Sequence, residues 1–426
     1  MLESIEIEPV GKPVRARMHP PGSKSITNRA LVCAALAEGT STLRGALDSE
    51  DTRVMIAALG ELGIAVAAQE AGRTLVIKGA GGRIPAVEAA LFCANSGTTI
   101  RFLTALVTLG RGTFRLDGIE RMRQRPIADL LDALNQLGAH ARSEAGNGCP
   151  PVFVHANGLP GGIATVRGDI SSQFLSALLM VAPAAASPVE LRIDGPLVSQ
   201  PYVQMTCAVM RTFGINIPPS DQFRLFQIAS PTSYRACDFA IEPDETAASY
   251  FWAAAAITGG EVTVDGLSAE SLQGDVAFVD CLEAMGCEVR RDADSITVVG
   301  HPLVGVDIDM NAISDTVPTL AVVALYADGP TTIRNIGHVR HKETDRIAAL
   351  ATELRKLGAT VDERADGLTI APGRLQGAAI DTYDDHRMAM SFALAGLRQG
   401  GVRINNPRCT EKTYPNYFHD LAATVG

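Results

Sequence analysis

The sequence lacks several features that would assign the chain to a particular class of protein. None of its eight cysteines forms a Cys-x-x-Cys pair or stands beside a histidine at metal-ligand spacing, which indicates reduced thiols and no metal. No stretch approaches the ~18 uninterrupted apolar residues of a membrane span. The first residues, MLESIEIEPV, also lack the charged-then-apolar layout of a signal peptide. We therefore expect a cytoplasmic protein with no metal and no membrane contact.

Other absences narrow the chemistry. There is no glycine-rich loop of P-loop spacing, no nucleophile elbow and no Ser-His-Asp order, so ATP hydrolysis and covalent acyl chemistry fit poorly. The formal net charge of −10 argues against a general nucleic-acid binder. At 426 residues, with 46% hydrophobic and 20% charged residues, the chain is an ordinary globular protein too long for one hydrophobic core.

A repeat becomes visible in the places where helices are expected to end. Glycine is the usual residue just past a helix, and five such glycines are spaced 75, 76, 72 and 72 residues apart. They are Gly63, Gly138, Gly214, Gly286 and Gly358. The pattern predicts six β-α-β-α-β-β units, the last cut short, arranged as two α/β domains of three. We expect one domain at 21–239 and the other at 1–20 plus 240–426, with strands in SIEIEPV and PVRARMH completing the sixth unit.

The predicted helix starts of these units hold an unusual number of cations. Helix N-termini are already partly positive, yet eleven of the 37 basic residues gather there. They are Lys24, Arg29, Arg101, Arg121, Arg123, Arg125, Arg340, Lys342, Arg346, Arg387 and Lys412. Because this opposes the helix dipole, we expect a strongly anionic ligand, with arginines giving bidentate contacts to phosphate or carboxylate.

Each polar residue also has a purely structural interpretation. A serine or aspartate at a helix start could simply cap the helix, and the run RHKETDR could be a solvated face. The possible caps are Ser23, Ser25, Ser171, Ser172, Asp315 and Asp385. Caps do not explain eleven cations, however. Two acids among those cations, Asp315 and Glu343, suit proton movement on a polyanionic substrate, whereas we expect His386 to pack or to orient its neighbours.

Seven motifs resemble the 5-enolpyruvylshikimate-3-phosphate synthase family, in order from about residue 20 to the C-terminus. They are PGSKSITNRAL, NSGTTIRFL, RMRQRPI, DISSQFLSALLM, RHKETDRIAALATELRKLG, DDHRMAM and CTEKTYPNYF. The resemblance implies a two-domain inside-out α/β barrel with the active site in the cleft between the domains. It also implies transfer of the enolpyruvyl group of phosphoenolpyruvate to the 5-hydroxyl of shikimate 3-phosphate, with release of phosphate and no cofactor. The expected partners are these two small molecules, for a cytoplasmic monomer of the shikimate pathway.

The resemblance also implies a role for each residue that matches a family motif. The residues expected to bind shikimate 3-phosphate are Lys24, Ser25, Arg29, Ser171, Ser172, Gln173, Ser199, Tyr202, Asp315, His338 and Lys342. Those expected to bind phosphoenolpyruvate are Lys24, Asn95, Gly97, Arg125, Gln173, Arg346, Arg387 and Lys412. Asp315 is expected to be the base at the 5-hydroxyl, while Glu343 and Lys24 are both candidates for the proton donor to the methylene carbon.

Three departures and two alternatives accompany this resemblance. His338 stands where many bacterial members have asparagine, Phe102 stands where proline is frequent, and PDETAASY replaces a serine-rich loop. Gly97 is kept, which implies sensitivity to glyphosate. One alternative is the sister transferase that acts on UDP-N-acetylglucosamine, although the loop GIERMRQRPI has no cysteine where that family has one. The other is a non-catalytic phosphate-binding scaffold.

Overall fold

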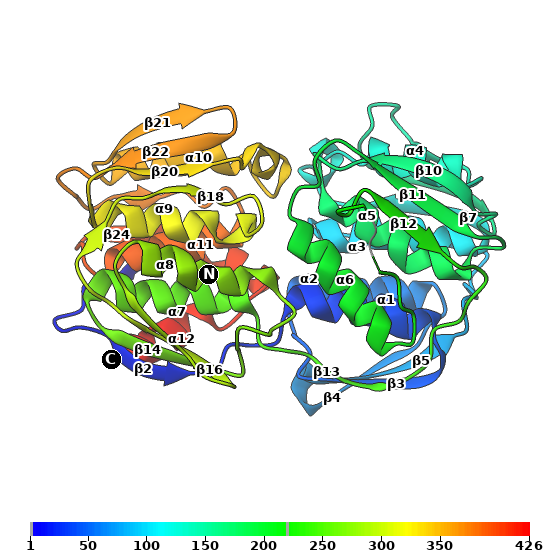
Figure 1. The fold of residues 1–426 in the computed structure, drawn as a ribbon, viewed down its shortest axis with the longest axis horizontal. Coiled ribbons are helices and arrows are strands. Elements are labelled where there is room, and N and C mark those ends of the chain that lie inside the picture. Colours follow the sequence, from blue (N-terminus) through cyan, green and yellow to red (C-terminus); the bar gives the residue numbers. More distant parts are fainter. Residues whose placement is uncertain (1–2, 219–220) are drawn as a thin grey trace. The chain divides into compact units, whose positions relative to one another are not determined.

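The computed structural model describes residues 3–218 and 221–426. The chain divides into two compact units (Figure 1). We call Gly22–Ile241 the inserted unit, and Met1–Pro21 together with Glu242–Gly426 the composite unit. Each unit consists of alternating strands and helices, broadly as the repeat predicts.

The inserted unit has three sheets and six α-helices among its described residues. The sheets are β13 (Asp238–Ala240), β3 (Glu38–Arg44), β5 (Thr74–Ala80), β4 (Val66–Gln69); β6 (Glu88–Phe92), β7 (Arg111–Asp117), β9 (Val152–Asn157), β8 (Ala141–Ser143); and β10 (Gly162–Arg167), β11 (Val189–Asp194), β12 (Leu225–Ile228). The helices are α1 (Lys24–Leu36), α2 (Glu50–Glu61), α3 (Gly97–Leu106), α4 (Ala128–Gln136), α5 (Ser172–Val181) and α6 (Gln200–Thr212).

The composite unit repeats this plan. Its larger sheets are β15 (Glu288–Arg291), β16 (Ser295–Val299), β14 (Glu261–Asp265), β2 (Arg15–Met18); β18 (Asp307–Asp309), β20 (Thr331–Arg334), β22 (Gly367–Ala371), β21 (Thr360–Arg364); and β1 (Ser4–Ile7), β24 (Val402–Asn405), β23 (Ala379–Ile380). A small sheet pairs β17 (Leu303–Val304) with β19 (Ala327–Asp328). The α-helices are α7 (Glu245–Thr258), α8 (Phe278–Ala284), α9 (Val317–Val323), α10 (Arg346–Lys356), α11 (His386–Gly396) and α12 (Tyr417–Val425).

The first helix of each repeat lies in the core of its unit, with the sheets around it. In α5, SQFLSALLMV, all residues but Gln173 are buried, as expected for a helix that is mostly apolar on every side. Every residue of α7 except its last is buried, including Phe251 and Trp252. In the strands, buried residues instead alternate with more exposed ones, as in β11, where Val189, Leu191 and Ile193 are buried. Helices inside and sheets outside confirm the inside-out arrangement (Figure 1).

The five glycines that revealed the repeat end helices, as predicted. Each follows the second helix of its repeat and has a positive φ, between 81° and 109°. Residues with a side chain rarely adopt this conformation, so glycine is the favoured residue there. At Gly63, after α2, an added Cβ would also lie 2.9 Å from Cβ of Pro85. The chain thus reverses after α2, α4, α6, α8 and α10 because a glycine follows each of these helices.

The two N-terminal strands join different repeats. β1 pairs antiparallel with β24 of the sixth repeat, which confirms the prediction for SIEIEPV. The prediction for PVRARMH is wrong, because β2 pairs parallel with β14 of the fourth repeat. On β24 both edges are already occupied, by β1 and by β23, whereas β14 has an edge that accepts a parallel strand.

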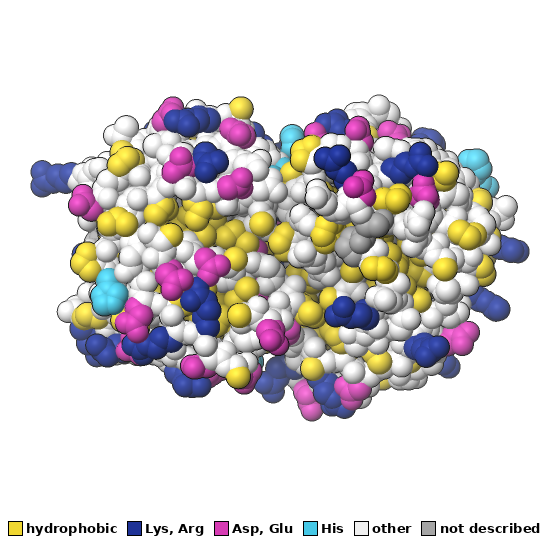
Figure 2. Space-filling model, in the orientation of Figure 1, with side chains coloured by type: hydrophobic (Ala, Val, Ile, Leu, Met, Phe, Trp, Pro, Cys, Tyr) yellow, Lys and Arg dark blue, Asp and Glu magenta, His cyan; other side chains and the backbone are white. Residues whose placement is uncertain are grey.

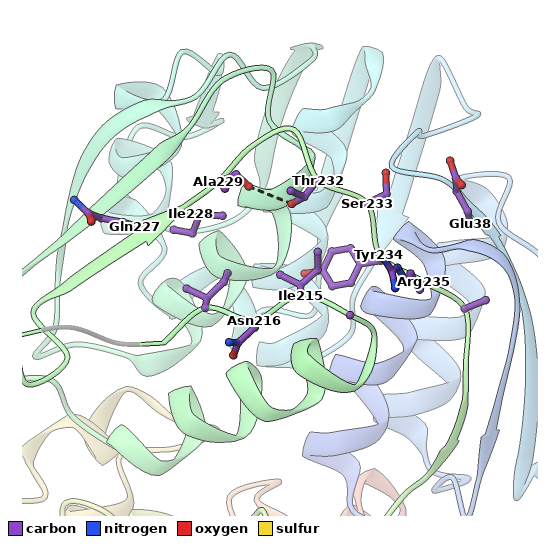
Figure 3. A pocket seen from close by; sticks show the side chains of 13 residues that line it. Glu38, Ile215, Asn216, Gln227, Ile228, Ala229, Thr232, Ser233, Tyr234 and Arg235 are labelled. Atoms are coloured by element: carbon purple, nitrogen blue, oxygen red, sulfur yellow. Dashed lines mark hydrogen bonds between the residues drawn. The ribbon is translucent and has the colours of Figure 1, made fainter.

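The third repeat departs from the predicted strand pattern after α6. Ile215 and Ile217 are buried in alternation, but the described residues there form no strand beside β12, and Pro218 has no N–H to donate to a ladder. A groove of about 610 Å³ lies between Gly214–Ile217 and Gln227–Ala229 instead (Figure 3). None of the substrate-binding residues expected from the sequence lines this groove.

The two glycines near the end of α2 should respond oppositely to alanine. Gly60→Ala places its Cβ in open space on an exposed helical residue, so the variant should be more stable by about 0.5–1 kcal/mol. Gly63→Ala forces a side chain onto φ +81° against Pro85, so it should be less stable by more than about 1 kcal/mol. Urea unfolding midpoints measure both changes, and equal shifts for the two variants would contradict this account.

Candidate functional site

Serine side chains fix the starts of three helices in the inserted unit. The Oγ atoms of Ser23, Ser96 and Ser171 accept hydrogen bonds from backbone N–H groups of the first turns of α1, α3 and α5. Two of the possible capping serines, Ser23 and Ser171, are therefore caps. The next residues, Lys24 and Ser172 among them, stand at the first helical position, where neighbouring N–H groups point out of the helix.

Lys24 and Arg29 are both buried cations of α1, but they are stabilised differently. Lys24 Nζ lies 3.6 Å from a carboxylate oxygen of Asp51, near the start of α2. Arg29 donates instead to neutral oxygens, at 2.7 Å to Thr206 Oγ1, 2.9 Å to Ser25 O and 3.3 Å to Tyr202 O. Burial lowers the pKa of Arg29 to about 10, so the side chain remains a cation at neutral pH.

Four side chains converge on the start of α3. Arg125 donates to the backbone oxygen of Asn95 at 2.9 Å and to its side-chain oxygen at 3.2 Å. Arg101 donates to Gln173 Oε1 at 3.0 Å. Gly97 lies against these groups, because a Cβ there would be 2.6 Å from Arg125 Nη2 and 2.7 Å from Arg101 Nη1. Gly97 is thus required for close approach of two cations.

Ser199 and Tyr202, the other two expected residues of this unit, lie at the start of α6. Ser199 precedes the helix in a left-handed conformation, with φ 49°, and is buried. This conformation costs a non-glycine residue of order 1–3 kcal/mol and is typical of functional positions. The ring of Tyr202 lies beside the Arg29 guanidinium, 5.9 Å from its carbon.

In the composite unit the expected residues gather around Arg346, at the start of α10. Its side chain is 1% exposed and donates to Asp385 at 2.8 Å, Asp315 at 3.0 Å and Glu343 at 2.9 Å. Burial alone would lower the pKa of Arg346, but the charges of these carboxylates raise it above its ordinary value. The Arg346 side chain is therefore always a cation.

Asp315 is surrounded by cations rather than capping a helix. Its carboxylate oxygens lie 2.7 Å from Arg387 Nη2, 3.0 Å from Arg346 Nη1 and 3.3 Å from Lys342 Nζ. The pKa of Lys342 is lowered, chiefly by burial and further by the neighbouring arginines. Glu343 is bound by Arg346 and lies 3.9 Å from Lys412 Nζ. Two buried carboxylates with shared cations form a site suited to moving protons on an anion.

Two buried histidines are neutral in this unit. Burial and the charge of Lys342 lower the pKa of His338 to about 3. Burial also lowers the pKa of His386 well below its ordinary value, so its 3.7 Å approach to Asp385 is not an ion pair. Neither ring nitrogen of His386 has a hydrogen-bond partner among the described residues. His386 is packed, as expected, but it does not orient a neighbour through a hydrogen bond.

The charge argument made from the sequence needs correction. At least seven of the eleven cations have a carboxylate of the chain within 4.0 Å, so their presence at helix starts does not by itself require an external anion. They are Lys24, Arg123, Arg340, Lys342, Arg346, Arg387 and Lys412. Asp117 and Asp345 lie close in sequence to Arg123 and Arg340, whereas the other carboxylates come from distant parts of the sequence and are missed when each motif is examined by itself. RHKETDR is also only partly a solvated face, because Glu343 and Arg346 are buried.

Sequence analysis missed two residues that organise these groups, Asp51 and Asp385. Asp51 pairs with Lys24, and Asp385 both caps α11 and binds Arg346. Asp385 was considered only as a cap. These residues could have been found by looking for acids about half a repeat or one repeat along the sequence from a cation. The repeat brings successive helix starts together in space.

The described residues contain no cluster of three or more His, Cys, Asp or Glu side chains suited to a metal ion. Their helices include none long and apolar enough to cross a membrane. On the face shown in Figure 2, basic and acidic side chains lie side by side. Exposed ion pairs such as Arg290 with Glu288, at 2.7 Å, are common among the described residues.

Solved structures with this fold identify the class of protein. EPSP synthase from Acinetobacter baumannii superposes with a TM-score of 0.81 at 25% identity, covering 99% of this chain and 98% of that one. The enolpyruvyl transferase NikO from Streptomyces tendae gives 0.77 at 21% identity, covering 99% and 97%. The six repeats in two units are therefore the enolpyruvyl transferase fold.

Sequence comparison defines the family. The model of EPSP synthase (3-phosphoshikimate 1-carboxyvinyltransferase) matches residues 9–421. Proteins named 3-phosphoshikimate 1-carboxyvinyltransferase are 46% identical over all 426 residues in Trichormus variabilis, and 48% identical over 419 residues in Nostoc punctiforme, covering 98% of each chain. The chain belongs to the EPSP synthase family and is a transferase.

His338 should make folding stability depend on pH. Its pKa is about 3 in the folded chain and 6.5 ordinarily, so below pH 6.5 the unfolded chain binds a proton that the folded chain does not. The neutral imidazole thus stabilises the fold fully above pH 6.5, and this contribution falls as the pH falls. Between pH 7 and pH 5 wild type should lose about 2 kcal/mol more than His338→Asn. Urea unfolding at both pH values measures this, and parallel losses would contradict it.

Proposed function

We propose that this chain transfers the enolpyruvyl group of phosphoenolpyruvate to the 5-hydroxyl of shikimate 3-phosphate and releases phosphate. The observation that most supports this is that the Asp315 carboxylate binds Lys342, Arg346 and Arg387. Glu343 binds the same Arg346. Joining two anions requires cations to offset their repulsion and carboxylates to move protons, and this group has both.

Shikimate 3-phosphate is assigned mainly to the helix starts of the inserted unit. Its phosphate oxygens are acceptors, which suit the outward N–H groups at the starts of α1, α5 and α6 together with hydroxyls and cations. The residues proposed are Lys24, Ser25, Arg29, Ser171, Ser172, Gln173, Ser199 and Tyr202, with Asp315, His338 and Lys342 from the composite unit. A neutral His338 can donate one hydrogen bond and accept another, which suits a ring hydroxyl.

Phosphoenolpyruvate is assigned to basic residues of both units, those near Gly97 in the inserted unit and those that bind Asp315 and Glu343 in the composite unit. A carboxylate and a phosphate on one small molecule match several guanidinium groups, because each can make paired hydrogen bonds. The residues proposed are Lys24, Asn95, Gly97, Arg125 and Gln173 from the inserted unit, and Arg346, Arg387 and Lys412 from the composite unit. Residues of both units are thus assigned to each substrate.

In the addition step, the 5-hydroxyl oxygen bonds to the enol carbon and its proton passes to Asp315. The methylene carbon of phosphoenolpyruvate takes a proton at the same stage, giving a tetrahedral intermediate with a methyl group. In the elimination step the carbon–oxygen bond to phosphate breaks, the methyl group loses a proton and the enol ether forms. Cations around Asp315 and Glu343 stabilise the charge on the departing phosphate.

The proton for the methylene carbon is assigned to Glu343, with Lys24 as the alternative donor. Arg346 and Lys412 favour the charged form of Glu343 as long as they bind it. An incoming phosphate or carboxylate that takes over these cations removes that stabilisation, which favours protonated Glu343. Substrate binding would thus prepare the donor. No other group is needed, and we place the reaction in a cytoplasmic monomer without a cofactor.

Phosphate release distinguishes the proposed reaction from its alternatives. Purified protein is incubated with phosphoenolpyruvate and either shikimate 3-phosphate or UDP-N-acetylglucosamine, and inorganic phosphate is measured. We expect release only with the shikimate ester. Release only with the nucleotide sugar would assign the chain to the sister activity, and no release with either would support a non-catalytic phosphate-binding scaffold.

Asp315→Asn should separate turnover from binding. Loss of a general base lowers kcat by about 10²–10⁴-fold. The dissociation constant of phosphoenolpyruvate should stay equal or decrease, because the variant removes a negative charge that competes for Arg346 and Arg387. The matched control is Asp307→Asn, on an exposed carboxylate paired with Arg334, which should keep wild-type kcat. Wild-type turnover by Asp315→Asn would refute the assignment of the base.

A further inference from the structure

Arg101 is a buried cation of the inserted unit to which no substrate has been assigned. It lies in the second turn of α3 with 3% of its surface exposed, and its side chain runs back toward the start of the helix. Nη1 donates to Gln173 Oε1 at 3.0 Å and to Gly97 O at 3.3 Å, while Nη2 donates to Pro126 O at 2.9 Å. One guanidinium thus connects the starts of α3 and α5 with the residue that follows Arg125.

The contact with Arg101 sets the polarity of the Gln173 amide. A guanidinium has only donors, so the amide oxygen must face it and the NH₂ group must point the other way. The backbone of Gln173 is held as well, since its N–H donates to Ser171 Oγ at 3.3 Å. Gln173 is therefore fixed as a hydrogen-bond donor toward whatever lies beyond its amide.

The Arg101–Gln173 hydrogen bond depends on Gly97. A Cβ at position 97 would lie 2.7 Å from Arg101 Nη1 and 3.1 Å from Gln173 Oε1, closer than ordinary contact. The ring of Phe174 supports the guanidinium from another side, with 5.4 Å between the guanidinium carbon and the ring centroid. These contacts thus hold the Arg101 guanidinium in one orientation.

We propose that Arg101 is a positioning residue for the reaction: it holds the Gln173 NH₂ group toward an anionic oxygen of the substrate. This inference rests on the proposed function. Without Arg101 the amide can rotate by half a turn and present its oxygen to the anion, which replaces a hydrogen bond by repulsion. Arg101 acts through Gln173 and need not touch substrate.

A double-mutant cycle tests this dependence. Arg101→Met, Gln173→Ala and the double variant are compared in steady-state phosphate release, with KM for each substrate. Each single variant should lower kcat/KM by about ten- to a hundredfold, the loss expected for one hydrogen bond to a charged group. If Arg101 acts through Gln173, the double variant should be no worse than Gln173→Ala. Losses that multiply would overturn the proposal.

Arg101→Lys supplies a second test and replaces Arg101→Met in the cycle if that variant does not fold. Lysine keeps the charge but cannot donate to Gln173 and Pro126 in the fixed fork of a guanidinium. We therefore expect Arg101→Lys to retain most of the defect, and wild-type kinetics would overturn the proposal. The matched control is Arg142→Met, an arginine of the same unit whose guanidinium carbon lies 5.1 Å from the Phe153 ring centroid, and which should keep wild-type kinetics.

The side-chain amide of Gln173 gives a readout independent of turnover. With glutamine labelled by ¹⁵N, the Gln173 NH₂ signal should be sharp in wild type and should shift and broaden in Arg101→Lys, but not in Arg142→Met. An unchanged signal in Arg101→Lys would overturn the positioning role. An inactive wild type with the expected amide signals would instead refute the proposed function and leave the structural part of the inference standing.

Discussion

The composite unit depends on the buried ion pairs of Arg346. Taking charges out of water is costly, and removal of one partner leaves another charge uncompensated. Here the guanidinium binds Asp315, Glu343 and Asp385, which belong to the starts of three different helical segments. Those segments are therefore tied to one another by electrostatics as well as by packing. The same pairs set the directions of the side chains that face the proposed substrates.

The repeat brings the starts of its two helices together, and the residue types there decide what the pair can do. In the first repeat, Lys24 at the start of α1 pairs with Asp51 of α2. In the fourth repeat, Glu245 at the start of α7 instead faces Asp275. Burial and the charge of Asp275 raise the pKa of Glu245 well above its ordinary value. One pair is ionic, whereas in the other a second carboxylate disfavours the charged form of Glu245, although the backbone plan is the same.

Much of this architecture could be predicted from the sequence because its causes are local. Glycines past helices need no long-range information, and neither do serine caps such as Ser171. Pairing across the chain was harder: Arg387 meets Asp315 from 72 residues away, and β2 joins the fourth repeat rather than the sixth. The absence of a strand after α6 has a local cause, Pro218. The repeat nevertheless led us to predict a strand there. The expectation of an external anion failed for a different reason, because carboxylates from other parts of the chain bind these cations.

In the unbound chain Arg346 and Arg387 are already paired with carboxylates, and this pairing connects substrate binding to catalysis. If Arg346 and Arg387 were bare, an anionic substrate would simply fill a vacancy. Because they already bind Asp315 and Glu343, the substrate must compete for the same donors. A contact that the substrate gains by displacing a carboxylate leaves that carboxylate with fewer cations, which makes it a stronger base. Under the proposed function, substrate binding thus strengthens Asp315 as a base and favours protonated Glu343 through the same cations that hold both carboxylates in the unbound chain.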